Sequence, residues 1–94
     1  MSEGLLFALI ARIPSHGVAS FNAYEDQVLP LLAAHGGVLQ RRLSTDDGGT
    51  ELHLVWFPSA AAFAAYRDDP RRAALAPLMV ASEAELDLLA MRDV

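Results

Sequence analysis

The 94-residue sequence contains no cysteine and no lysine, and all seven of its basic residues are arginine. The missing cysteine excludes disulfides, thiol nucleophiles and thiolate clusters, and the missing lysine excludes Schiff-base catalysis. Basic charge is scarce overall, because twelve acidic residues leave a formal net charge of -5. A chain with this charge lacks the electrostatic footprint of phosphate-backbone binding, so we expect no nucleic-acid partner.

Long hydrophobic runs are also missing, although hydrophobic residues make up 53% of the chain. The apolar run at residues 5–11 is interrupted by Arg12 and is too short to cross a bilayer. Residues 1–4 include an acid and no basic side chain, unlike the start of a secretory signal. The sequence therefore predicts a cytoplasmic protein with no membrane partner, folded as a single domain over residues 1–94.

The first half of the chain shows a strand pattern followed by a helix pattern. Continuous apolar residues at 5–13 predict a strand in the middle of a sheet. Apolar residues at spacings of three and four predict a helix that starts at Ser20 and stops at the glycines of 36–37. Pro30 lies inside this helix and predicts a break near residues 26–29.

Two strand patterns, at residues 38–45 and 50–57, flank an Asp-Asp-Gly-Gly segment whose composition predicts a hairpin turn. If Thr45 faces Thr50, strand alternation divides the side chains between two faces. The first face is predicted to hold Leu39, Leu43, Leu52, Leu54 and Trp56. The second is predicted to hold Arg42, His53 and Phe57, with Arg42 opposite His53. Both faces of the sheet are therefore expected to be substantially apolar.

The remaining patterns complete a known arrangement of elements. Ser59 is a suitable cap for a helix over residues 60–67, and the Asp-Pro pair that follows predicts another over 71–79. The tail at 84–91 is compatible with helix or strand, and we assign it as a strand because a closing strand completes a split βαβ fold. The sequence predicts an α+β, ferredoxin-like βαββαβ domain: a four-stranded antiparallel sheet with its helices on one face.

The three histidines are the first candidates for chemistry. No pair stands at the i, i+4 spacing of a helical metal site, so we expect no metal. His16 lies in a loop and His35 closes a helix, where solvated or capping roles are expected. His53 lies in mid-strand and is either a hydrogen-bonded core residue or a polar group lining a pocket.

The aromatic residues predicted to face the sheet are core residues or the walls of a small cavity. Buried tyrosine hydroxyls need partners, and the polar groups predicted on that sheet face belong to Arg42 and His53. His53 and Tyr66 are the best candidates for a catalytic role. The candidate ligand pocket consists of Tyr24, Arg42, His53, Phe57, Phe63 and Tyr66.

The remaining charged residues are assigned structural roles. The acidic pairs at 46–47 and 68–69 fall at turns, where aspartate bonds to nearby backbone groups. Arg67, Arg71 and Arg72 lie beside the second pair and are expected to form a solvated, self-neutralising surface.

Several short motifs together resemble a bacterial family of unknown function in the dimeric α/β-barrel superfamily. They are Tyr24-Glu25, Leu29-Pro30-Leu31-Leu32, His35-Gly36-Gly37, Phe57-Pro58-Ser59, Ala62-Phe63, Tyr66-Arg67-Asp68-Asp69-Pro70 and Leu75-Ala76-Pro77-Leu78. The resemblance implies a ferredoxin-like fold and a homodimer whose sheets pair into a barrel.

Monooxygenases of the same superfamily, both cofactor-free and haem-degrading, carry a tryptophan, a serine two residues later and a histidine seven residues after that. The corresponding positions here are Phe57, Ser59 and Tyr66. Because the position of the haem-ligating histidine holds a tyrosine, we expect no cofactor.

Three functional hypotheses follow. The first is a homodimeric α/β-barrel protein that binds a small, partly apolar ligand between sheet and helices. The second is a cofactor-independent monooxygenase or isomerase that uses His53 or Tyr66 as proton carrier. The third is a structural dimerisation module with a filled core and no active site. A cavity beside His53 favours the first two hypotheses over the third.

Overall fold

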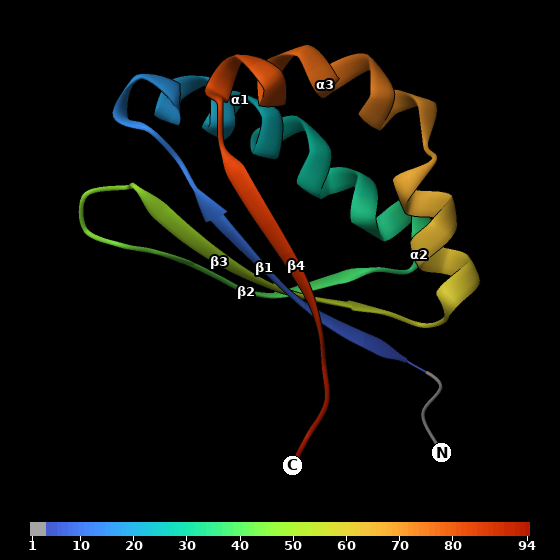
Figure 1. The fold of residues 1–94 in the computed structure, drawn as a ribbon. Coiled ribbons are helices and arrows are strands. Elements are labelled where there is room, and N and C mark those ends of the chain that lie inside the picture. The colour runs from blue at the N-terminus through green and yellow to red at the C-terminus, as the bar shows by residue number, and fades with distance from the viewer. Residues whose placement is uncertain (1–3) are drawn as a thin grey trace.

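The computed structural model describes residues 4–94 and shows four strands and three α-helices in two layers, as Figure 1 illustrates. The strand order is β2-β3-β1-β4, every neighbouring pair is antiparallel, and the helices cover one face of the sheet. The elements are β1 (Leu5–Arg12), η1 (Ser15–Gly17), α1 (Val18–Val28), η2 (Leu29–His35), β2 (Val38–Ser44), β3 (Thr50–Phe57), α2 (Ala60–Arg67), α3 (Pro70–Ser82) and β4 (Glu85–Met91). The predicted ferredoxin-like α+β fold is confirmed.

The first and last strands lie side by side. β1 is hydrogen-bonded to β3 on one side and to β4 on the other, so its predicted place within the sheet is confirmed. β4 forms the edge, and its side chains are exposed along its whole length. No helix in the part of the chain that the structure describes is long and apolar enough to cross a membrane.

The β2–β3 hairpin has the predicted register near its turn but not at its far end. Arg42 lies opposite His53, and Leu43 lies opposite Leu52, as expected. An irregularity between Leu39 and Arg41 then shifts the pairing by one residue, so that Leu39 lies opposite Val55 and packs on the helix-covered core. The prediction of Leu39 beside Trp56 on the open face was wrong, because a β-bulge reverses the alternation of the bulged strand.

The first helix begins earlier than predicted. Its N-cap is Gly17, and Ser20 lies within the helix instead of capping it. Gly17 packs directly on the backbone of Ser82 at the end of α3, where a Cβ atom would collide with the Ser82 carbonyl oxygen. The α-helix ends at Val28 and continues as the 3-10 helix η2, which confirms the break predicted from the internal proline.

The caps of the other helices follow the sequence signals. The Ser59 hydroxyl accepts a hydrogen bond from the Ala62 amide at the start of α2. Asp69 caps α3 by accepting from the Arg71 amide, and the helix continues three residues beyond the predicted end at Met79. The pocket described below lies between these helices, η2 and the covered face of the sheet.

The other face of the sheet carries no helix (Figure 1). Strand pairing places Leu52 and Trp56 of β3 there, beside Leu6 and Ile10 of β1, all only partly buried. Apolar residues of the flanking strands extend the surface, and the more exposed of these are Val38, Leu43, Leu89 and Met91. The expectation that both sheet faces are apolar is confirmed.

Candidate functional site

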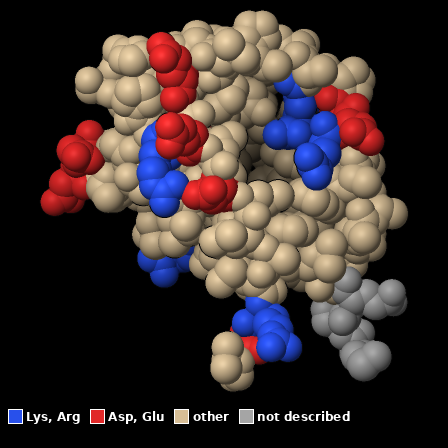
Figure 2. Space-filling view, in the orientation of Figure 1, with Lys and Arg blue, Asp and Glu red and all other residues tan. Residues whose placement is uncertain are grey.

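A cavity of about 270 Å³ lies between the sheet and the helices and opens to solvent. Figure 2 shows a hollow on this side of the molecule, bordered by arginine side chains. Leu86 and Leu88 of the edge strand line the cavity, and about half of each residue remains exposed. The space between the sheet and the helices is therefore not completely filled by side chains, as it would be in a purely structural module.

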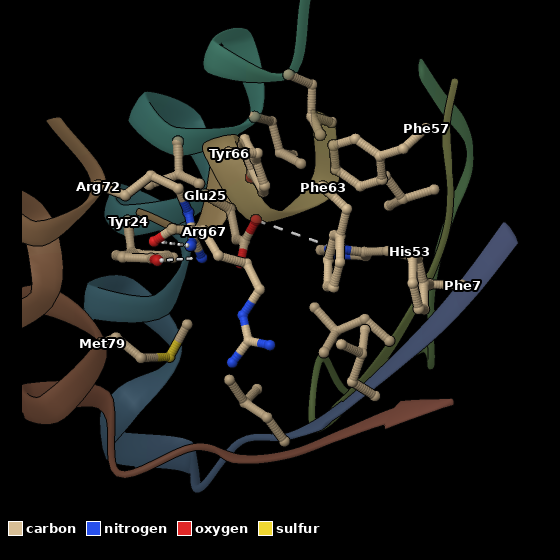
Figure 3. Close-up of a pocket in the computed structure, with 17 residues that line it drawn as sticks. Phe7, Tyr24, Glu25, His53, Phe57, Phe63, Tyr66, Arg67, Arg72 and Met79 are labelled. Carbon is tan, nitrogen blue, oxygen red and sulfur yellow. Dashed lines mark hydrogen bonds and ion pairs between the residues drawn. The ribbon is translucent and has the colours of Figure 1, made fainter. Parts of the chain in front are cut away.

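The walls are mainly aromatic and aliphatic (Figure 3). Phe7 of β1 stacks on Phe63 of α2, with ring centroids 4.3 Å apart, and Phe57 of β3 packs edge-on against Phe63 at 5.2 Å. Five of the six residues proposed for the pocket from the sequence lie around this cavity. They are Tyr24, His53, Phe57, Phe63 and Tyr66.

Arg42, the sixth predicted pocket residue, does not line the cavity. Its Nε donates to Oε1 of Glu51 at 2.8 Å, so the guanidinium is held beside the neighbouring strand. The pairing of Arg42 opposite His53 was predicted correctly. The two side chains do not bond to each other, because each forms a hydrogen bond with the carboxylate of Glu51.

His53 is held by that same carboxylate. Its Nε2 lies 2.8 Å from Oε1 of Glu51, and the His53 residue is only 1% exposed. Burial would raise the pKa of Glu51, but hydrogen bonds from Arg42 and His53 outweigh it and keep that pKa below its ordinary value. Glu51 is therefore a carboxylate that only accepts, which makes Nε2 the donor and leaves Nδ1 of a neutral imidazole as an acceptor.

A second carboxyl group faces the other ring nitrogen. Oε2 of Glu25, on α1, lies 4.0 Å from Nδ1 of His53, as the dashed line in Figure 3 marks. Glu25 is 3% exposed and lines the cavity. Burial raises the pKa of Glu25 to about 7, so its carboxyl group is poised to hold or release a proton near neutral pH.

Arg72 of α3 reaches the opposite side of the cavity instead of pointing into solvent. Its Nη2 donates to the Tyr24 hydroxyl at 3.2 Å, and its guanidinium carbon lies 4.5 Å from the centre of the Tyr66 ring. The prediction of a solvated Arg72 was wrong, because the two tyrosines provide a hydrogen-bond acceptor and an aromatic face for its partly buried side chain.

Tyr66, the second residue proposed as a proton carrier, lies beneath that guanidinium. Burial raises the pKa of Tyr66 to about 12. Its phenol stays protonated at neutral pH, so it can donate a hydrogen bond to a ligand but cannot act as the base.

The other two arginines of this segment differ from each other. Arg71 forms the expected surface pair, with Nη2 2.8 Å from Oδ2 of Asp69. Arg67 lines the cavity, and its guanidinium carbon lies 5.5 Å from the centre of the Phe63 ring. Figure 3 shows the Arg67 side chain extending into the space between the helices and the sheet. Arg71 thus meets the whole expectation, whereas Arg67 is exposed as expected but pairs with no acid among residues 4–94.

The remaining histidines lie outside the cavity lining. His16 pairs with exposed Glu83 at 3.0 Å, and His35 bonds to the helix-capping Asp69 at 2.8 Å. Within residues 4–94, no group of three or more histidine, aspartate or glutamate side chains is placed to hold a metal ion.

Sequence reasoning missed Glu25, Glu51 and Arg72. Glu51 could have been found by strand alternation, since it lies two residues before His53 and therefore faces the same side. Glu25 follows Tyr24 on the helix and resembles an ordinary surface acid in the sequence. Nothing in the local pattern marks Arg72, because its contacts depend on the packing of α3 against α1.

Neither a protein-family model nor a curated protein matches the sequence. The fold does match solved structures. SnoaB, a cofactor-independent oxygenase from Streptomyces nogalater, superposes with a TM-score of 0.75 at 17% identity, over 99% of this chain and 97% of that one.

Two further solved structures share this fold. Rv0793 from Mycobacterium tuberculosis gives a TM-score of 0.73 at 16% identity over 97% of both chains. A Caulobacter crescentus protein, provisionally assigned as an antibiotic biosynthesis monooxygenase, gives 0.72 at 13% identity over 97% of this chain and 92% of that one. At these identities the likeness establishes the fold alone, a ferredoxin-like four-stranded antiparallel sheet with helices on one face.

Proposed function

We propose that this protein binds a small, partly apolar molecule in the cavity between sheet and helices, with His53 as the group that exchanges a proton with it. The observation that carries the proposal is an open, mainly apolar cavity of about 270 Å³ whose wall includes His53, which is held by its hydrogen bond to Glu51. Apolar walls with a few fixed polar groups are the usual composition of small-molecule sites.

The arrangement around His53 suits a ligand with an acidic O–H or C–H bond. Glu51 holds Nε2–H in place, so Nδ1 is the atom that accepts a proton. When Nδ1 takes the proton, the electron pair of the broken bond stays on the ligand as a phenolate or enolate. The carboxylate of Glu51 then stabilises the imidazolium that has formed.

The second candidate function is catalysis of the oxygenase or isomerase type, which begins with this same proton transfer. The Glu51–His53 hydrogen bond favours it because a base oriented by a third group is the usual catalytic arrangement. The structural likeness to SnoaB, a cofactor-independent oxygenase, gives it weak further support.

We also propose that two copies associate through their uncovered sheet faces. Apolar side chains from all four strands lie on this face with no helix over them, and an uncovered apolar sheet face is typical of an interaction surface. Pairing of two such faces would give the barrel that the sequence motifs imply, and it would leave the cavity on the helix side accessible.

The binding proposal is tested by calorimetric titration with 2-naphthol, a bicyclic phenol with one acidic proton. Wild-type protein should bind it, and His53→Phe should lose at least about tenfold in affinity, since it keeps the ring shape and removes the proton acceptor. His16→Phe is the matched control and should bind like wild type, because His16 does not line the cavity. Equal binding by all three proteins would contradict the role of His53.

A further inference from the structure

The nitrogen Nε of Arg72 is buried and has no hydrogen-bond partner among the described residues. The two terminal nitrogens of the same guanidinium are occupied. Nη1 donates to the Arg67 carbonyl at 3.3 Å, and Nη2 donates to the Tyr24 hydroxyl at 3.2 Å. One donor of a cation in the cavity lining is therefore left without an acceptor.

Leaving such a donor unpaired is costly. A buried polar group without a partner retains its full desolvation penalty, and the penalty is larger when the group is charged. The hydrogen-bond and ring partners of Arg72 are a hydroxyl, a carbonyl and an aromatic ring, none of which carries a negative charge. Glu25 interacts with Arg72 through space, but burial raises its pKa to about 7, so near neutrality its charge is incomplete.

Arg67 adds a second positive charge at the same side of the cavity. No ion pair or hydrogen bond of its guanidinium is found among residues 4–94, where it contacts the Phe63 ring. The nearby acid Asp69 is already bound to Arg71 and His35. In a chain with a net charge of -5, two arginines without a carboxylate partner at one cavity form an unusual local excess of positive charge.

We propose that the cavity selects ligands that carry a carboxylate, and that the guanidinium groups of Arg67 and Arg72 bind it while the apolar body lies against Phe7 and Phe63. The proposal rests on the ligand-binding function proposed above. A planar carboxylate suits the guanidinium fork, and it would supply the negative partner that both arginines lack among residues 4–94. The substrate class is therefore a small aromatic or similarly apolar acid.

The test compares 2-naphthoate with 2-naphthamide, a neutral ligand of nearly the same shape, by calorimetric titration at pH 6, where the Glu25 carboxyl group is mainly protonated and the ligand carboxylate is ionised. Wild-type protein should bind the acid at least about tenfold more tightly than the amide. Arg67→Gln should reduce this preference to less than about threefold by weakening acid binding alone. Arg72→Lys should do the same, because lysine keeps the charge but lacks the planar guanidinium fork.

Arg41→Gln is the matched control, since Arg41 lies on β2, is exposed and does not line the cavity. It makes the same change in net charge as Arg67→Gln and should leave both affinities unchanged. Circular dichroism confirms that each variant is folded, and exposed Arg67 carries the test alone if Arg72→Lys unfolds.

The outcomes separate the two proposals. If acid and amide bind wild-type protein equally, or if Arg67→Gln keeps the full preference for the acid, the carboxylate preference is wrong and the binding cavity remains. If neither compound binds, and 2-naphthol does not bind either, the ligand-binding function itself is wrong and this inference fails with it.

Discussion

Glu51 and His53 stand two residues apart on β3, and Oε1 of Glu51 accepts a hydrogen bond from Nε2 of His53 at 2.8 Å. Strand alternation turns both side chains toward the helices. The imidazole of His53 is therefore oriented by a residue of the same short segment. Arg42 on the adjacent strand binds the same carboxylate oxygen and keeps it ionised. The orientation of His53 therefore depends on two neighbouring strands and not on the ligand.

The first prediction concerns this hydrogen-bond chain. Glu51→Gln should lower the free energy of unfolding by roughly 1–3 kcal/mol, because it replaces a buried carboxylate that accepts from both Arg42 and His53. The measurement is urea denaturation at pH 7. Asp46→Asn, an exposed change in the hairpin turn, serves as control. If the free energy of unfolding falls no more for Glu51→Gln than for the control, the hydrogen bonds of Glu51 contribute nothing to stability.

The second prediction is a pH dependence that originates at Glu25. Burial raises its pKa to about 7 in the folded protein, from an ordinary value of 4.5 in an unfolded chain. Between these values the folded state binds more protons than the unfolded state, so this group makes the protein less stable as pH rises. Arg42, Arg72, Glu51 and Asp26 all contribute to the field that Glu25 experiences.

Glu25→Gln removes this titration, because glutamine stays neutral. The stability of the variant relative to wild type should therefore increase between pH 4.5 and 8, by up to about 3 kcal/mol for a shift of this size. Urea denaturation at several pH values measures it. Asp26→Asn, an exposed change on the same helix, should show no such increase. Parallel stability curves for wild type and Glu25→Gln would refute the assignment.

The third prediction concerns the uncovered sheet face. Sedimentation equilibrium should give the wild-type protein twice its chain mass of 10.1 kDa, because the uncovered apolar face is expected to be buried between two copies. A stable interface of standard size buries about 1,200 Å² or more in total. Leu52→Glu should sediment as a folded monomer, because Leu52 lies between Ile10 and Leu43 on that face and a charge there opposes its burial.

Val80→Glu is the control for that variant. Val80 lies on α3, is 74% exposed and does not belong to the sheet, so this change should leave the dimer intact. A wild-type protein that sediments only at 10.1 kDa at low micromolar concentration would contradict the proposed association.

The fourth prediction tests the close approach of α3 to the start of α1. A Cβ atom at Gly17 would collide with the carbonyl oxygen of Ser82, and backbone atoms cannot move aside as a flexible side chain can. Gly17→Ala should therefore destabilise the protein by roughly 3 kcal/mol or more, measured as a lower midpoint in thermal denaturation. Gly49→Ala, in the exposed hairpin turn, should cost clearly less because its nearest neighbour is the Asp47 side chain.

Most of the fold could be predicted from the sequence because its signals are local. The caps Ser59 and Asp69 mark the last two helices correctly, and Pro30 marks the break between α1 and η2. The start of α1 was missed because Gly17, with no side-chain cap, serves where Ser20 offered a conventional one. The bulge after Leu39 was missed because nothing in an alternating pattern specifies an inserted residue.

The candidate site was less predictable. Its aromatic walls follow from helix and strand periodicity, so Phe57, Phe63 and Tyr66 were found. The charged groups were misjudged because their burial depends on tertiary packing. Arg42 was placed in the cavity and lies outside it, while Arg72 was placed outside and lies within it. Composition alone cannot distinguish a solvated arginine from one that packs over a tyrosine ring.

The proposed function requires contact between a ligand and His53. The most direct test of this contact is the long-range ¹H–¹⁵N NMR spectrum of the histidine rings during titration with 2-naphthol. We predict that the ring-nitrogen signals of His53 shift in a saturable manner while those of His16 do not, because only His53 lines the cavity. Unchanged His53 signals at ligand concentrations well above millimolar would contradict the claim that this cavity is a binding site.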